Sequence, residues 1–275
     1  MILDEFKLDG RVAVVSGAAS GMGKNMALGL AEAGADLLLA DINDEGMQAT
    51  ADEITSLGRR AVPVHCDVSC FEDIESLWDV LDSEYGKVDF LGNVAGEGVL
   101  SRPEDLTDEQ LTQVLQNLVI GRYAMSRNAG QRMIRDGGGS IVSIGSLASI
   151  TAMGRGHVAY SMAMGAVAQM TRELSTEWAT YGIRVNAILP AQVTNPGLIK
   201  RMDEDPNLHH QFISGIPIGR MGSPQEIKGI AVWLASGASS FTTGALIPFD
   251  GGNLAMNGGG TPGWVTRQRL EESAE

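Results

Sequence analysis

A glycine-rich turn near the amino terminus has the residue types and spacing of an anion-binding site. The apolar run Val12 to Val15 leads into Ser16-Gly17-Ala18-Ala19-Ser20-Gly21-Met22-Gly23, and a helical segment follows. Glycine permits the positive φ angles of a tight turn and a close approach of the backbone to a ligand, while N–H groups at the start of a helix attract an anion. The turn therefore predicts a binding site for the pyrophosphate of a dinucleotide.

A carboxylate follows at the end of the second apolar run, about 20 residues beyond the glycines. Asp41 is placed to accept hydrogen bonds from the adenosine ribose hydroxyls and to repel a 2′-phosphate, which favours NAD over NADP as the cofactor. The alternative is that Asp41 caps the next helix, because Asn43 and Asp44 are also polar.

Strand-like apolar runs alternate with helical segments along the chain. The runs cover 12–15, 36–40, 61–66, 88–92, 140–144, 184–189 and 245–249, and the helical segments cover 22–33, 44–57, 71–85, 107–135, 157–181 and 224–235. Seven runs that are buried on both faces and separated by helices predict a doubly wound parallel sheet, a Rossmann-like α/β fold. Neither a repeat nor a linker divides the chain, so we expect a single domain over residues 1–275.

Two segments depart from this alternation. Residues 195–222 contain three prolines and the pair His209-His210, and they connect a strand to a helix without a clear period. Such an excursion predicts a lid over the substrate. Residues 257–275, which begin near Gly258-Gly259-Gly260, predict a loose tail or a subunit-contact arm.

The composition excludes several classes of partner. Lys and Arg number 20 against 34 Asp and Glu, and the net charge of −14 repels nucleic acid and anionic membrane surfaces. No run approaches the roughly 20 apolar residues of a membrane span, and no secretory signal precedes the first strand, so we expect a cytoplasmic protein. Cys66 and Cys70 lie apart from any other Cys or His cluster, which predicts two reduced thiols and no metal site.

Several motifs resemble those of the short-chain dehydrogenase/reductase family. The turn matches Thr-Gly-x-x-x-Gly-x-Gly with Ser16 in the threonine position, and residues 93–96 match Asn-Asn-Ala-Gly with Val94 in place of the second asparagine. Residues 186–190 and 249–252 are similar to later family motifs, although Asn195 occupies a usual threonine position. This resemblance extends over about nine-tenths of the chain. It implies an NAD-dependent oxidoreductase of a small-molecule secondary alcohol or ketone, and a homodimer or homotetramer formed through two long helices.

The resemblance also implies the site residues. Tyr160 would be the acid/base group, and Ser146, at the end of the fifth run, would stabilise charge on the substrate oxygen. The residues that would contact the cofactor are Gly17, Ser20, Gly21, Met22, Gly23, Asp41, Asp67, Val68, Asn93, Ala95, Gly96, Tyr160, Met164, Pro190 and Val193.

Two of the four catalytic groups that the resemblance implies are replaced. Met164 stands where the family has a lysine that favours the phenolate and holds the nicotinamide ribose. Leu118 stands where the family has an asparagine, and Asn117 is one position away, turned by about 100° around the helix. An ordinary tyrosine has a pKa near 10, so loss of the adjacent cation disfavours proton abstraction at neutral pH.

These replacements leave several functions open. The first is an oxidoreductase with an atypical site, in which His157, three residues before Tyr160, is one candidate to replace the lysine. The second is a non-redox catalyst, such as an isomerase, lyase or dehydratase, that retains NAD. The third is a catalytically silent NAD-binding subunit. A further alternative is that Met164 is an engineered replacement.

Overall fold

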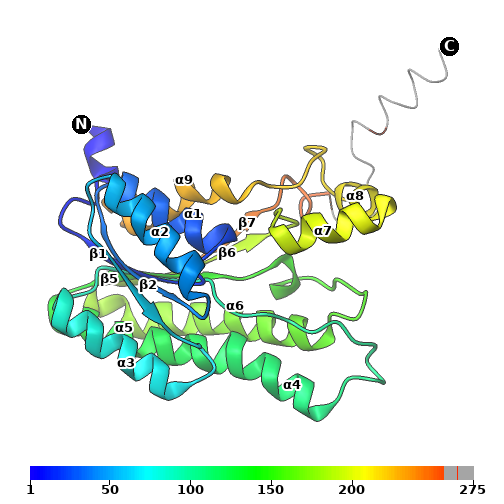
Figure 1. The fold of residues 1–275 in the computed structure, drawn as a ribbon, viewed down its shortest axis with the longest axis horizontal. Coiled ribbons are helices and arrows are strands. Elements are labelled where there is room, and N and C mark those ends of the chain that lie inside the picture. Colours follow the sequence, from blue (N-terminus) through cyan, green and yellow to red (C-terminus); the bar gives the residue numbers. More distant parts are fainter. Residues whose placement is uncertain (257–264, 266–275) are drawn as a thin grey trace.

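The computed structural model describes residues 1–256 and 265, which form a three-layer α/β fold (Figure 1). Seven parallel strands make one sheet in the order β3-β2-β1-β4-β5-β6-β7. The strands are β1 (Val12–Ser16), β2 (Asp36–Asp41), β3 (Ala61–His65), β4 (Phe90–Asn93), β5 (Gly139–Ile144), β6 (Ile183–Pro190) and β7 (Leu246–Phe249). The predicted fold class is confirmed. The strand order reverses between β1 and β4, which is where such sheets bind ligands beyond the carboxyl ends of their strands.

Helices cover both faces of this sheet. They are α1 (Gly21–Glu32), α2 (Asp44–Ser56), α3 (Phe71–Glu84), α4 (Asp108–Leu115), α5 (Arg122–Asp136), α6 (Val158–Trp178), α7 (Pro196–Glu204), α8 (Pro206–Ile213) and α9 (Ile227–Ala235). Figure 1 shows α1, α2 and α9 on one face and α3, α5 and α6 on the other. No helix in the described part of the chain has the length and apolar character needed to cross a membrane.

The central strands explain why both faces are covered. Ala13 and Val15 of β1 pack in the cluster beneath α1 and α9, whereas Val12 and Val14 pack in the opposite cluster with α3 and α5. Side chains alternate between the faces of a strand, so an uninterrupted apolar run needs a helical layer on each side.

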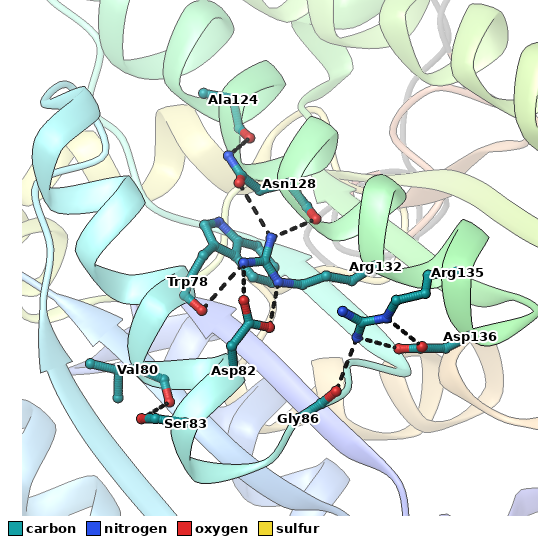
Figure 2. Close-up of polar contacts among 10 residues, drawn as sticks. All are labelled: Trp78, Val80, Asp82, Ser83, Gly86, Ala124, Asn128, Arg132, Arg135 and Asp136. Carbon is teal, nitrogen blue, oxygen red and sulfur yellow. Dashed lines mark hydrogen bonds and ion pairs between the residues drawn. The ribbon is translucent and has the colours of Figure 1, made fainter.

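An arginine on α5 ties that helix to α3 (Figure 2). Arg132 donates hydrogen bonds from Nε and Nη2 to the two carboxylate oxygens of Asp82, at 2.8 and 2.6 Å. Its guanidinium also lies over the ring of Trp78, with Cζ 4.9 Å from the ring centroid. The hydrogen bond from Arg132 is the main cause that lowers the pKa of Asp82.

The predicted helix over 107–135 begins correctly but is not continuous. Thr107 caps it and forms a capping box with Gln110, as the sequence indicates. The α-helical pattern then ends at Leu115, and a π-helical segment, Gln116–Gly121, separates α4 from α5. At its end a Cβ on Gly121 would lie 1.9 Å from the carbonyl oxygen of Val68, so only glycine permits this approach. A π-helical turn accommodates one extra residue, and it changes which side chains face the site.

The segment 195–222 contains two short helices that the sequence analysis missed. Asn195 caps α7 by accepting a hydrogen bond from the N–H of Leu198, and Asp205 caps α8 by accepting one from Asn207. A proline follows each cap at the first helical position, and this local signal was available in the sequence. Val193 and Gly222 form a bridge at the base of the segment. The predicted tail, 257–275, lies outside the described residues except at position 265.

Candidate active site

A cavity of about 470 Å³ lies over the glycine turn, and we call it the glycine-turn cavity. Most of the predicted cofactor-binding residues lie on its wall: Gly17, Ser20, Gly21, Met22, Gly23, Asp41, Asp67, Val68, Ala95, Gly96 and Val193. They come from β2, α1 and the segments that follow β1, β3, β4 and β6. Residues far apart in the sequence therefore meet beyond the carboxyl ends of the strands.

The three glycines of the turn are required for different reasons. A Cβ on Gly23 would lie 1.9 Å from the carbonyl oxygen of Gly17, so only glycine fits the helix start against the turn. Gly17 has a φ of +71°, and a Cβ there would lie 2.9 Å from the amide nitrogen of Ala95. Gly21 also has a positive φ, but open space surrounds the position of its absent Cβ. This backbone fits a dinucleotide pyrophosphate at the amino terminus of α1.

Asp41 points its carboxylate toward this cavity and orders the turn. It accepts hydrogen bonds from the backbone N–H groups of Ala19 and Asn43, both at 3.0 Å. Asn43, not Asp41, is the residue that caps α2. The described wall of the glycine-turn cavity also contains Asp67 and Glu97 but no Lys or Arg, so its ionisable side chains are all acidic.

A second cavity of about 460 Å³ contains the two predicted catalytic residues, Ser146 and Tyr160, and we call it the serine–tyrosine cavity. It shares wall residues with the glycine-turn cavity, which makes the two continuous: Met22, Val94, Gly96, Val193 and Asn195. Pro190 also lines it. A dinucleotide in the first cavity would therefore reach the wall of the second.

Ser146 and Tyr160 reach the serine–tyrosine cavity from different elements. Ser146 follows β5 and is 7% exposed, and its Oγ accepts a hydrogen bond from the N–H of Ala148 at 3.2 Å. This contact leaves the hydroxyl proton of Ser146 available to a ligand. Tyr160 lies in the first turn of α6, where a Cβ on Gly98 would come within 2.6 Å of its ring.

His157 lies beside the tyrosine. Its ring is 6.1 Å from that of Tyr160, centroid to centroid, in an edge-on arrangement. His157 Nδ1 is 2.7 Å from the carbonyl oxygen of Gly154, so Nδ1 carries the proton and Nε2 is the free nitrogen. This hydrogen bond holds the imidazole on the wall of the serine–tyrosine cavity.

The residues at the positions where the resemblance implies a lysine and an asparagine are both buried. Met164 and Leu118 are each 1% exposed and belong to one apolar cluster that also includes Val114, Ala159 and Val167. Leu118 reaches the wall of the serine–tyrosine cavity, whereas Met164 lies on the wall of neither cavity. The methionine predicted to contact the cofactor is placed in the protein core.

Two asparagines serve the framework. Asn117 accepts a hydrogen bond from the N–H of Glu97 at 3.1 Å and donates one to the carbonyl oxygen of Gln113, so its amide supports the loop after β4. Asn93, predicted to contact the cofactor, is fully buried and lines neither cavity. Its amide nitrogen donates to Ser126 Oγ at 2.9 Å and so ties β4 to α5.

Sequence analysis missed one charged residue on the wall of the serine–tyrosine cavity. Arg122, the first residue of α5, is only 3% exposed and reaches this wall. Its guanidinium donates hydrogen bonds to the carbonyl oxygens of Ala95, Val94 and Ile144, which follow or end β4 and β5. No local pattern marks it, because its partners lie more than 20 residues away along the chain.

Cys66 lies on the wall of the glycine-turn cavity and is a buried free thiol. Burial is the main cause that raises the pKa of the Cys66 thiol to about 12. Cys70 is the first residue before α3 and is also a free thiol. Among the described residues no group of three Cys, His, Asp or Glu side chains is arranged to hold a metal ion.

Comparison with known proteins is consistent with this geometry. A family model described as enoyl-(acyl carrier protein) reductase matches residues 17–253. A 2-dehydro-3-deoxy-D-gluconate 5-dehydrogenase from Dickeya dadantii is 36% identical over 93% of this chain and 100% of that protein. An NAD-dependent glycerol dehydrogenase from Listeria innocua is 36% identical over 90% of this chain and 95% of its own.

A solved structure extends the comparison to coordinates. The gluconate 5-dehydrogenase from Burkholderia cenocepacia, in complex with NADP and tartrate, superposes with a TM-score of 0.87 at 29% identity. The match covers 93% of this chain and 99% of that one. With the sheet order, the glycine turn and these matches in agreement, the chain belongs to the short-chain dehydrogenase/reductase family.

Proposed function

We propose that this protein is an NAD(H)-dependent oxidoreductase that interconverts a secondary alcohol and its ketone. The observation that carries the proposal is the continuity of the glycine-turn cavity with the cavity that Ser146 and Tyr160 line. The two relatives described above, which match 93% and 90% of this chain, are dehydrogenases, and this supports redox chemistry.

The roles of the two residues follow from their hydrogen-bonding capacity. NAD, when bound, takes up the hydride that leaves the carbinol carbon. The Tyr160 oxygen accepts the hydroxyl proton during oxidation and returns it during reduction. Ser146 Oγ accepts from Ala148 and so donates its own proton to the substrate oxygen, where negative charge develops.

Asp41 supports a preference for NAD over NADP. Its carboxylate faces a cavity whose described wall has no Lys or Arg to neutralise a 2′-phosphate. Titration with NADH and with NADPH tests this preference. We expect tighter binding of NADH. In the Asp41→Asn variant the ratio of the NADH affinity to the NADPH affinity should fall about tenfold, which corresponds to roughly 1.4 kcal/mol. Tighter binding of NADPH by the unmodified protein would contradict the assignment.

The charges of the serine–tyrosine cavity indicate the substrate class. Its described wall contains Arg122, His157 and Arg201 and no acid, although the chain as a whole carries a net charge of −14. Arg201 has no ion-pair partner among the described residues. This wall supports a polyhydroxy substrate that carries a carboxylate, and two of the relatives are named for sugar acids.

A spectrophotometric assay tests the activity and the substrate class together. Purified protein with NAD⁺ should raise the nicotinamide absorbance with sugar acids more than with the matching neutral polyols, and Tyr160→Phe should abolish the change while still binding NADH. Arg201→Met should raise KM for the acids and leave KM for the polyols unchanged. Equal use of acids and polyols would contradict the substrate class.

A second function is favoured by the apolar environment of Met164. Without a cation at this position, a protonated Tyr160 would act as a proton donor in an isomerase, lyase or dehydratase. Product analysis distinguishes this case. Substrate consumption without any change in nicotinamide absorbance, lost in Tyr160→Phe, would replace the redox proposal. A protein that binds NADH and consumes no substrate would instead be a silent subunit.

We also propose that the protein is a homodimer or homotetramer. Apolar side chains are exposed on and beside α5 and α6, and they are Ile120, Tyr123, Val158 and Met162. Such a surface on neighbouring helices suits a contact between identical subunits. Light scattering should give two or four times the monomer mass of 29.1 kDa, and a monomer would contradict the assignment.

A further inference from the structure

Arg122 is a buried cation with no carboxylate partner among the described residues. All of its hydrogen bonds in the described structure go to main-chain carbonyl oxygens: Nε and Nη2 donate to Ala95, Nη2 also donates to Val94, and Nη1 donates to Ile144. Burial of a charge is unfavourable unless it is paired, and neutral carbonyl oxygens offset only part of the cost. A neutral amide side chain would donate to carbonyls without that cost.

The position of Arg122 relates it to the replaced catalytic groups. It follows Leu118 by four residues across the π-helical segment, and both side chains reach the wall of the serine–tyrosine cavity. Tyr160 lines the same cavity, and it is the ionisable group whose charge acts on Arg122. Position 164 on α6 carries no positive charge, whereas a positive charge is buried at the start of α5 and reaches the cavity that Tyr160 lines.

We propose that Arg122 is the positioning residue that supplies the positive charge for Tyr160, in place of the lysine that Met164 replaces. This inference rests on the proposed function. The guanidinium stabilises the phenolate form of Tyr160, which accepts the substrate hydroxyl proton during oxidation and becomes a neutral phenol. In the reverse direction Tyr160 gives that proton back to the substrate oxygen, and the phenolate forms again. No bond to Arg122 forms or breaks, and the arginine keeps its protons throughout.

The guanidinium is charged under working conditions. Burial lowers the pKa of Arg122 to about 10, while the nearby Tyr160 raises it in opposition. At neutral pH the group therefore remains protonated. The other charged or titratable groups on this wall are His157 at the start of α6 and Arg201 on α7, and the acidic residues Asp41, Asp67 and Glu97 lie on the wall of the adjoining glycine-turn cavity.

The hydrogen bonds of Arg122 also limit what it replaces. Four N–H contacts hold the guanidinium against the ends of β4 and β5, so it supplies charge but is not free to hold the nicotinamide ribose. The proposal therefore separates two tasks that one lysine performs in the family. Stabilisation of the phenolate is retained, and the direct contact to the ribose is lost.

Two substitutions separate charge from carbonyl binding. Arg122→Gln keeps an amide that donates to carbonyls and removes the charge, whereas Arg122→Lys keeps the charge and fewer donors. Arg122→Gln should lower kcat by about 100-fold and move the rise of the pH profile of kcat/KM to higher pH. Arg122→Lys should keep kcat within about tenfold of the unmodified protein and leave the pH profile of kcat/KM unchanged. Thermal unfolding and NADH binding show whether each variant is folded.

A readout without turnover makes the inference independent of the substrate. Ultraviolet titration of tyrosine ionisation, with the Tyr160→Phe curve subtracted, isolates the Tyr160 signal among the four tyrosines. The isolated signal should appear at higher pH in Arg122→Gln than in the unmodified protein. An unchanged titration would show that Arg122 only binds carbonyls, even if the enzyme is active. A shifted titration in a protein that reduces no ketone would refute the proposed function and leave the role of Arg122 intact.

Discussion

The glycine-turn cavity and the serine–tyrosine cavity, which adjoin, differ in what determines their shape and chemistry. The wall over the glycine turn depends on Gly17 and Gly23, where a Cβ would meet backbone atoms, and on acidic side chains that include Asp41. The serine–tyrosine wall depends on charged and polar side chains. Leu118 lies on this wall at a position where the family resemblance implies an asparagine, and Met164, at the implied lysine position, is packed in the same apolar cluster as Leu118. At Gly17 and Gly23 no residue with a side chain fits, because the Cβ would meet backbone atoms. A charge, in contrast, can be supplied from another helix, as we propose for Arg122.

The largest effect is expected at the glycine turn. Gly23→Ala places a Cβ 1.9 Å from the Gly17 carbonyl oxygen, and a contact with backbone cannot be relieved by a side-chain rotation. We expect a loss of about 3 kcal/mol in the free energy of unfolding, the upper part of the range for overpacking. Binding of NADH should be lost as well. Denaturant unfolding and cofactor titration measure the two effects.

Gly229→Ala is the matched control for that substitution. It lies on α9, where an added Cβ meets nothing within 4 Å, so alanine should be neutral or slightly stabilising there. If Gly23→Ala were as harmless as Gly229→Ala, the turn would not be a site fixed by its backbone.

In the apolar cluster that contains Leu118 and Met164, by contrast, we expect one substitution to reduce the cost of the other in unfolding free energy. Leu118→Asn and Met164→Lys each bury a polar group in an apolar cluster and should each cost about 1 to 3 kcal/mol of unfolding free energy. Because both positions belong to one cluster, the double variant should cost less than the sum by about 1 kcal/mol. A double-mutant cycle from urea unfolding gives this difference. Strictly additive losses of unfolding free energy would mean that the side chains at positions 118 and 164 do not interact.

A smaller and purely kinetic effect is expected at Gly98. A Cβ there would lie 2.6 Å from the Tyr160 ring, which must then move. Gly98→Ala should lower kcat roughly 10- to 100-fold, the size of effect that a displacement of about 1 Å produces in a positioned group. NADH affinity should not change, because Gly98 is not on the wall of the glycine-turn cavity. A change confined to NADH affinity would contradict this prediction, because it would show that Gly98 acts on the glycine-turn cavity and not on Tyr160.

The smallest effect is expected away from both cavities, at the contact shown in Figure 2. Arg132→Met removes the ion pair with Asp82 and should cost about 1 kcal/mol, because the carboxylate is partly exposed to solvent. The folded protein lowers the pKa of Asp82, so the stabilisation is complete above the unfolded value of 3.8 and is lost as pH falls through the lowered value. The difference in unfolding free energy between Arg132→Met and the unmodified protein should therefore shrink below pH 3.8. Kinetic constants should remain unchanged.

Local patterns were sufficient for the framework and for one of the two walls. The apolar runs predicted all seven strands, and the glycine spacing after β1 predicted a closely packed turn. Both features depend on residues that are adjacent in the sequence. The same holds for the cap at Thr107. These features depend on near neighbours in the chain, which is what a sequence pattern records.

The other wall depends on contacts between distant segments. The π-helical segment Gln116–Gly121 arises where the helix meets the Val68 carbonyl, and nothing in its own sequence marks that contact. Burial of Arg122 depends on carbonyl groups at the ends of β4 and β5. The cap and proline pairs before α7 and α8 were readable, in contrast, and were missed because the segment lacks a helical period.

The most direct test of the proposed active site restores the lysine after the arginine has been removed. Turnover should be measured for the unmodified protein, Arg122→Gln, Met164→Lys and the double variant Arg122→Gln/Met164→Lys. We predict that Met164→Lys recovers most of the roughly 100-fold loss in the Arg122→Gln background. The same substitution should raise kcat little in the unmodified protein, because a cation is already present. No recovery in the double variant, or a large gain from Met164→Lys alone, would contradict the claim that Arg122 supplies the charge of this active site.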